Sequence, residues 1–238
     1  METPDFIHVV ALLLNLNKKI LYSKSIINKI SLKQALDFVI NRYKQWTRLL
    51  ESQGSGLMDE NTRKGLLGEL LFLEQRIDES GSTLTAIQGW SGANRADQDF
   101  MYPDGWYEIK SLGVAATSVT ISSLEQLDCD DYGELVIMRI DKVAPERNGA
   151  LSLNDAVHRI IKKIFDHTEA LDLFRTKLMA YGYIDLHEYS EQKYFYSSMQ
   201  RYKVNDSFPR LTSESVPSQV VSLHYQLSLP SLVDWLKR

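Results

Sequence analysis

Apolar residues recur at helical spacing in two stretches near the start of the chain. Between residues 31 and 51, six apolar side chains fall on one helical face, and Ser31 and Gln34 have the spacing of a capping box. The segment 53–56 is rich in glycine, and a second helix is predicted after it over residues 59–77. We therefore expect two successive helices before any sheet.

Shorter apolar stretches follow, and their composition and alternation predict five strands, at residues 82–88, 97–101, 106–111, 119–122 and 135–140. The last of these is broken only by Arg139, which is typical of a central strand. Two further helices are expected at residues 153–165 and 168–181, and strand-like stretches near 194–204 and 220–229. This order of elements indicates a mixed α/β or α+β sheet protein.

The turn-forming sequence Tyr-Pro-Asp-Gly at 102–105 joins two of these strands. If its middle two residues form the loop, Asp99 faces Glu108 and Phe100 faces Tyr107. A bulge at the glycine would shift this register by one residue, and that alternative stays open. Side chains alternate along a strand, so one face of the hairpin carries four charged residues: Asp97, Asp99, Glu108 and Lys110.

This charged face is the strongest candidate for chemistry. Two carboxylates directly opposite each other repel, which destabilises a sheet. A divalent cation between Asp99 and Glu108 would turn that repulsion into coordination, because Mg²⁺ is typically held by one or two carboxylates, water and phosphate oxygens. Lys110 would then stabilise charge that develops on a phosphate. The alternative is a solvated acidic surface with a cross-strand ion pair.

Charge is unevenly distributed along the 238 residues, whose net charge is −4. Residues 1–50 carry eight Lys and Arg against three Asp and Glu, whereas residues 51–150 carry eight against eighteen. The acidic excess therefore lies around the candidate site. The single cysteine, Cys129, excludes an intrachain disulfide and a cysteine-rich zinc site. It fits the expected cytoplasmic location, and a cysteine-poor secreted protein would fit as well. The apolar run 7–14 is too short to cross a bilayer, so no membrane segment is expected.

Asp99, followed nine residues later by Glu108-Ile-Lys110, resembles the D…(D/E)-x-K signature of the PD-(D/E)XK nuclease superfamily. The surrounding sequence is similar to one uncharacterised bacterial family of that superfamily, whose members tend to be encoded among restriction and phage-defence genes. The resemblance covers about residues 31–238. It suggests a shortened or divergent N-terminal region at residues 1–30, and whether this region is a shortened domain stays open. The similar segments are residues 65–73, Trp90, and residues 98–100, 107–111, 121–127 and 208–211.

The resemblance implies an α/β fold, a restriction-endonuclease-like mixed β-sheet flanked by helices. It also implies a metal site that holds Mg²⁺, for which Mn²⁺ could substitute. The metal ligands would be Asp99, Glu108 and a glutamate from the preceding helix, with Lys110 as the fourth catalytic residue. The family motif selects Glu69 as that glutamate, although Glu74 lies nearer the centre of the apolar helical face. Gly65 and Gly68 would allow the helix close to a neighbouring strand.

Four further residues are candidates for substrate binding, each with an ordinary alternative. Gln126 could contact the site or DNA, or cap local structure. Ser111 could support Lys110 or end its strand. Lys162 and Lys163 could contact phosphates, or form the charged outer face of a helix.

We therefore predict a metal-dependent endonuclease that hydrolyses DNA phosphodiester bonds in restriction or phage defence. The alternative is a catalytically silent nuclease-like module that binds DNA or a partner protein. The expected domains are an N-terminal region with a leading helix at residues 1–55 and the nuclease-like domain, with a C-terminal helical and strand extension, at 56–238. The expected partners are DNA and proteins of a defence system, and a homodimer is left open.

Overall fold

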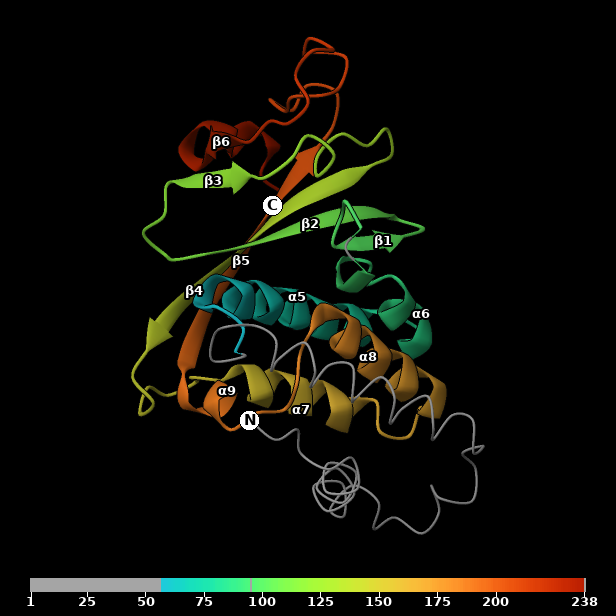
Figure 1. The fold of residues 1–238 in the computed structure, drawn as a ribbon, viewed down its shortest axis with the longest axis vertical. Coiled ribbons are helices and arrows are strands. Elements are labelled where there is room, and N and C mark those ends of the chain that lie inside the picture. Colours follow the sequence, from blue (N-terminus) through green and yellow to red (C-terminus); the bar gives the residue numbers. More distant parts are fainter. Residues whose placement is uncertain (1–56, 95, 238) are drawn as a thin grey trace, which may run out of the picture. The chain divides into compact units, whose positions relative to one another are not determined.

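The computed structural model describes residues 57–94 and 96–237 (Figure 1). Almost all of them belong to one compact unit, Met58–Arg238. The helix predicted over residues 31–51 lies outside the described residues. The domain boundary near residue 55 stays a prediction.

α-Helices, β-strands and short 3₁₀ helices alternate along this unit. In chain order they are α5 (Glu60–Glu79), α6 (Thr83–Gln88), η1 (Gly92–Asn94), β1 (Phe100–Tyr102), β2 (Gly105–Leu112), β3 (Ser118–Ile121), β4 (Gly133–Val143), α7 (Leu153–Lys163), α8 (Thr168–Tyr181), α9 (Glu188–Glu191), β5 (Lys193–Val204), β6 (Tyr225–Ser228) and η2 (Leu229–Trp235).

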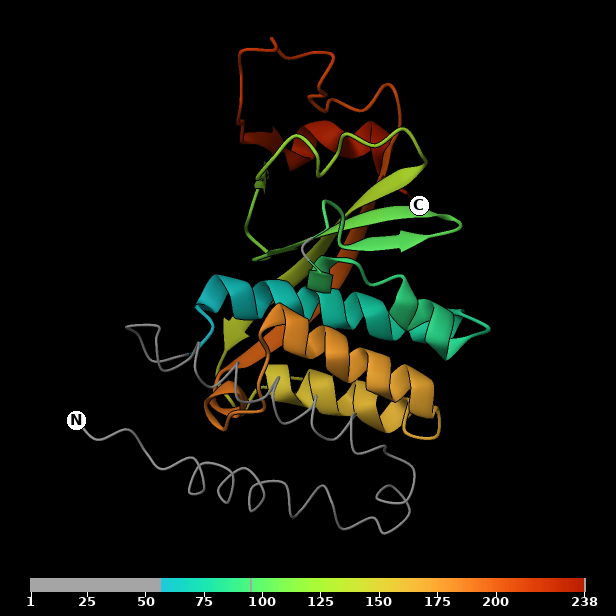
Figure 2. The same ribbon diagram turned by 45° about the vertical axis from the view of Figure 1, so that its right-hand side comes forward.

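The main sheet has the strand order β1-β2-β4-β5. β2 and β4 are parallel, whereas β1 and β5 run antiparallel to their neighbours. The helices α5, α7 and α8 lie on one side of this sheet, and the two-stranded β3–β6 sheet with η2 lies on the other (Figures 1 and 2). This arrangement confirms the predicted mixed sheet flanked by helices. β4 is the central strand that its apolar sequence predicted, since its residues 133–140 are all buried.

Local signals set most element boundaries. The Asp59 side chain accepts a hydrogen bond from Thr62 N and begins α5, and Ser152 and Asp155 form a capping box that begins α7. The strand predicted at residues 82–88 is wrong, because the segment forms α6. The Ser82 hydroxyl accepts a hydrogen bond from Thr85 N and begins this short helix, which buries Ala86 and Ile87.

Two other predicted strands are shorter than expected. The first strand of the hairpin begins at Phe100 rather than at Asp97, and the last strand spans only residues 225–228. The predicted hairpin register is correct, because Phe100 pairs with Tyr107 and Tyr102 with Gly105. The open alternative of a bulge at Gly105 is therefore excluded.

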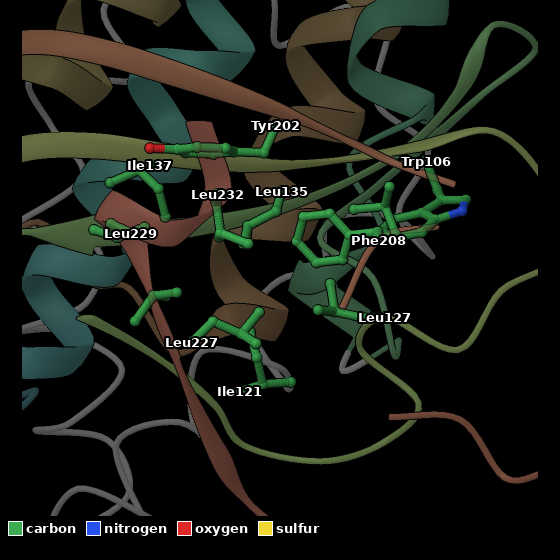
Figure 3. Packing of buried hydrophobic residues seen from close by; sticks show 12 residues of the cluster. Trp106, Ile121, Leu127, Leu135, Ile137, Tyr202, Phe208, Leu227, Leu229 and Leu232 are labelled. Carbon is green, nitrogen blue, oxygen red and sulfur yellow. The ribbon is translucent and has the colours of Figure 1, made fainter. Parts of the chain in front are cut away.

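An apolar core joins the main sheet to the β3–β6 layer (Figure 3). Leu127, Leu135 and Ile137 are fully buried there and meet Leu227 and Leu232 from the C-terminal segment. This packing fixes the turn that leads from β3 to Leu127. The turn carries Gln126, so the core positions that side chain over β2.

Within residues 57–94 and 96–237, none of the helices has the length and apolar character that a membrane crossing requires.

Candidate metal site

β1 and β2 diverge immediately beyond the Phe100–Tyr107 pair, and the candidate site lies at this divergence. Asp99 precedes β1, and its Oδ2 accepts a hydrogen bond of 2.8 Å from Ile109 N. The carboxylate of Asp99 thus satisfies a β2 backbone N–H that no strand reaches from this side. We call the group formed by Glu69, Asp99, Glu108 and Lys110 the notch.

Glu108 is almost completely buried, with 2% of its surface exposed. Its Oε1 lies 2.8 Å from Lys110 Nζ. Its Oε2 is also buried and has no hydrogen-bond partner among the described residues. This burial overturns the alternative of a solvated acidic surface, and it leaves one carboxylate oxygen that lacks a partner.

Gln126 holds Lys110 from the β3 side. Its Oε1 accepts hydrogen bonds from Lys110 Nζ at 3.0 Å and from Ser122 N at 2.8 Å. Gln98, next to Asp99 in the sequence, donates from Nε2 to the Glu125 carbonyl oxygen at 2.6 Å. The turn 122–127 is therefore tied to both sides of the notch. Gln126 therefore caps this turn and contacts Lys110 of the notch, whereas its contact with DNA stays a prediction.

Glu69 enters the notch from α5. It is 6% exposed, and its two oxygens accept hydrogen bonds from Trp90 Nε1 at 2.7 Å and from the Tyr181 hydroxyl at 2.8 Å. Glu74 points to the opposite side of α5, where it pairs with Arg159 and Lys163 of α7. The structure thus places the glutamate that the motif selected, and not the one favoured by periodicity, beside the hairpin.

Gly68 brings α5 against the sheet. A Cβ atom at Gly68 would lie 2.0 Å from Ser111 Oγ, so a larger residue would push the helix away. Gly65 does not approach a strand, because its nearest neighbour would be the Tyr181 hydroxyl at 3.9 Å. The expectation of close packing is correct for Gly68 and wrong for Gly65.

A second glycine keeps space between Glu69 and Asp99. A Cβ atom at Gly92 would lie 2.8 Å from Asp99 Oδ1 and 3.0 Å from Glu69 Oε2. The two acids therefore flank the same small volume. It opens into a cavity of about 250 Å³ whose other lining residues are mostly alanine: Ala93, Ala96, Ala180 and Tyr181.

Burial raises the pKa values of all three acids, and the charge of Asp99 adds to this effect at Glu69 and Glu108. Burial, followed by the charge of Asp99, raises the pKa of Glu108 to about 8, although Lys110 opposes the shift. Burial raises the pKa of Asp99 to about 6. Burial and then Asp99 raise the pKa of Glu69 well above its ordinary value. One lysine is therefore too little positive charge for three ionised carboxylates at this depth.

The residues present fit a hard divalent cation held by few protein ligands. Within the described part of the chain, no group of three or more His, Cys, Asp or Glu side chains is arranged to hold a metal ion. Mg²⁺, however, commonly takes only one or two carboxylates and fills its shell with water and phosphate oxygens. Asp99 and the unpartnered oxygen of Glu108 supply such donors. Oxygen ligands also favour Mg²⁺ or Mn²⁺ over softer metals.

The remaining predicted residues lie away from this chemistry. Ser111 does not end its strand, and its buried Oγ faces Gly68 on the side of β2 opposite Lys110. It therefore does not support the lysine. Lys163 pairs with Glu74 and Asp78 of α5. α5 lies between α7 and the hairpin, so neither Lys162 nor Lys163 is brought to the notch (Figures 1 and 2). Their contact with a substrate stays a prediction.

Asp97 lies apart from the notch. The predicted register, extended along the hairpin, puts Asp97 opposite Lys110, but the strand pairing ends at Phe100 and Asp97 is exposed. The lysine pairs with Glu108 instead. Sequence reasoning also gave no role to Trp90 or Tyr181. These residues are 21 and 112 positions from Glu69, and no periodicity connects them to it.

Comparison with known families gives one match. Residues 21–230 match a family described as "Putative PD-(D/E)XK family member, (DUF4420)". No curated protein and no solved structure matches the chain.

Proposed function

The chain belongs to this PD-(D/E)XK family, and from that premise we propose that it is a metal-dependent nuclease that hydrolyses DNA phosphodiester bonds at the notch. The observation that carries the proposal is the buried Glu108 carboxylate. It lies beside a second acid, and a lysine contacts one of its oxygens, while the other oxygen has no partner among residues 57–94 and 96–237. Groups with such perturbed pKa values cluster at functional sites.

In this proposal Asp99 and Glu108 hold Mg²⁺, and Glu69 contributes from the cavity side. When bound, the cation supplies Lewis-acid activation of a water and of a phosphate oxygen. Lys110 donates hydrogen bonds to the phosphate and offsets the charge that grows on it during attack. Gln126 keeps the Lys110 ammonium over β2, because it accepts a hydrogen bond from Nζ at 3.0 Å. The buried setting strengthens each of these interactions.

The source of DNA attraction lies outside the notch. DNA carries roughly one negative charge per 1.7 Å of its axis, and the notch has three acids and one lysine. The N-terminal 50 residues have eight Lys and Arg against three Asp and Glu, so we expect them to supply cationic contacts. Binding by the isolated chain should then be weak and salt-sensitive. Self-association or partner proteins of a restriction or phage-defence system would provide the remaining affinity.

The second candidate is a nuclease-like module that binds DNA or a partner without catalysis. Such a module has no need of buried, mutually repelling acids beside a lysine, because a buried group without a partner destabilises the fold. The notch therefore favours the enzyme.

The test is cleavage of plasmid and linear DNA by the purified full chain with Mg²⁺, Mn²⁺, Ca²⁺ or a chelator. Glu108→Gln protein, purified in parallel, controls for contaminating nucleases. We expect cleavage with Mg²⁺ and Mn²⁺ only, and none by the variant. Equal activity of the two proteins, or cleavage in chelator, would refute the proposal. DNA binding without cleavage would favour the silent module.

A further inference from the structure

Each oxygen of the Glu69 carboxylate accepts one hydrogen bond from a neutral donor. Trp90 Nε1 lies 2.7 Å from Oε2, and the Tyr181 hydroxyl lies 2.8 Å from Oε1. We call Trp90 and Tyr181 the glutamate clamp. An indole N–H can only donate, so its contact is satisfied only while a carboxylate oxygen faces it. Neither donor belongs to α5, so the clamp fixes the side chain independently of its own helix.

Trp90 is itself held firmly. It is fully buried and forms an isolated bridge with Phe100. Its carbonyl oxygen accepts a hydrogen bond from the buried Lys177 Nζ. Its ring stacks on Tyr181, with centroids 6.2 Å apart and an interplanar angle of 27°. The two donors therefore support each other, and the indole N–H cannot turn away from Glu69 without disrupting this packing.

The residues that follow Trp90 also fix the second acid. Ser91 N and Gly92 N both donate to the Asp99 carbonyl oxygen, at 2.8 and 2.9 Å. One short segment thus holds the side chain of Glu69 and the backbone of Asp99. It sets the spacing of the two carboxylates that flank the space at Gly92.

We propose that Trp90 and Tyr181 are positioning residues that aim the Glu69 carboxylate into the notch and thereby set the affinity of the notch for a divalent cation. The inference rests on the proposed function. An ionised carboxylate offers about four acceptor positions, and the clamp uses one on each oxygen. The others remain for the cation or for water in its shell. Hydrogen-bond partners of this kind typically change metal affinity by about 10- to 100-fold.

The first test measures Mg²⁺ affinity of the full chain by calorimetry. Tyr181→Phe removes only a hydroxyl and should weaken binding by about 10- to 100-fold. The same substitution in a Glu69→Gln background should produce little further loss, because Tyr181 acts through Glu69. Tyr183→Phe is the matched control, since it removes a buried hydroxyl that bonds Asn154 Oδ1 at 2.7 Å, away from the notch.

The outcomes separate the two claims. The positioning role would be overturned if Tyr181→Phe bound Mg²⁺ as tightly as the unmodified chain. It would also be overturned if the substitution weakened Mg²⁺ binding equally in the unmodified and the Glu69→Gln chains. Either result would leave the proposed function intact. Absence of Mg²⁺ binding by the unmodified chain would defeat the proposed function, and the positioning role with it.

A second test needs no substitution that could disturb folding. The indole N–H resonance of Trp90 in ¹⁵N-tryptophan-labelled protein should shift when Mg²⁺ saturates the chain. Trp106 and Trp235 provide internal references, because their indoles donate to Asp131 O at 2.9 Å and to Ser207 Oγ at 3.1 Å. A Trp90 resonance that stays as constant as these two, with Mg²⁺ demonstrably bound, would overturn the inference.

Discussion

Two buried glutamates on neighbouring parallel strands have opposite surroundings. Glu108 on β2 pairs in register with Leu135, and Glu134 on β4 pairs with Tyr107, so the two acids lie close together in one sheet. Both are almost fully buried. Glu134 meets Arg201, Lys237 and the Tyr132 hydroxyl. Glu108 lies near one lysine and two other acids, and its Oε2 has no hydrogen-bond partner within the described part of the chain.

The pKa values express this difference. Burial alone would raise the pKa of Glu134, but hydrogen bonds from Arg201, Lys237 and Tyr132 outweigh it, and the pKa lies below its ordinary value. The pKa of Glu108 rises to about 8. An acid that stabilises the fold is surrounded by positive charge. Repelling acids with too little positive charge favour a site for a positively charged ligand, and the proposed divalent cation would supply the positive charge that the notch lacks.

The largest expected difference between the two regions is in activity. Lys110→Ala should reduce metal-dependent DNA cleavage by about 100- to 1,000-fold, because it removes a donor aimed at the developing charge. Lys237→Ala is the matched control, since Lys237 also pairs with a buried glutamate, at 2.6 Å. Its cleavage rate should stay within about twofold of the unmodified chain, and initial rates under saturating Mg²⁺ would measure both. Undiminished cleavage by Lys110→Ala would contradict the proposed role of the lysine.

Stability should change in opposite directions when each glutamate is neutralised. At pH 9 without metal, both acids are ionised in the folded and unfolded states. Glu134→Gln then loses its ion pairs, and unfolding free energy should fall by on the order of 3 kcal/mol. Glu108→Gln relieves repulsion and should raise it by about 1 kcal/mol or less. Denaturant-induced unfolding would measure the unfolding free energy of both variants. A loss of stability in Glu108→Gln as large as in Glu134→Gln would contradict the proposed difference between the two glutamates.

Space at the notch provides a third contrast. Gly92→Ala places a methyl group between Glu69 and Asp99 and should weaken Mg²⁺ binding by about tenfold or more. Gly113→Ala is the control, because its Cβ would lie 2.9 Å from the carboxylate of Asp141, which is not part of the notch. Calorimetric titration would measure the Mg²⁺ affinity of both variants. Equal affinities of the two variants would show that the space at Gly92 has no role in Mg²⁺ binding.

The smallest expected effect concerns pH. The folded-state pKa of Glu108, about 8, lies above its ordinary value of 4.5, so the metal-free chain loses stability as pH rises between these values. A cation must displace the same proton, and Mg²⁺ affinity should therefore increase by about fivefold between pH 7 and 8. Calorimetry in buffers of different ionisation enthalpy would count the protons released. A pH-independent affinity would contradict the pKa assigned to Glu108.

The sequence predicted the hairpin because its information is local. The turn at 102–105 fixes the register, and alternation then places Glu108 and Lys110 on one face. The local sequence gave the wrong element at residues 82–88. Thr and Ile there favour a strand, but the Ser82 hydroxyl caps the first turn of a helix. The burial of the acidic face of the hairpin could not be predicted from the sequence. An acidic face is exposed or buried according to what covers it, and here the β3–β6 layer and the turn that carries Gln126 cover it, while α5 packs on the opposite face of β2.

The choice between Glu69 and Glu74 shows a second limit. α5 is apolar on most sides, so helical periodicity cannot say which glutamate faces the sheet. Tertiary partners decide it, because Arg159 and Lys163 bind Glu74 while Trp90 and Tyr181 bind Glu69. These partners come from distant parts of the chain, and only the family motif selected the glutamate that lies beside the hairpin.

The central claim is that Asp99 and Glu108 together hold a divalent cation. The most direct measurement is a crystal structure of the full chain grown with Mn²⁺, with anomalous diffraction to locate the metal. We expect an anomalous peak within about 2.3 Å of a carboxylate oxygen from each residue, with the Lys110 amine on the same face. A saturated crystal whose Mn²⁺ lies elsewhere, such as at the exposed acids Asp130 and Asp131, would contradict the claim.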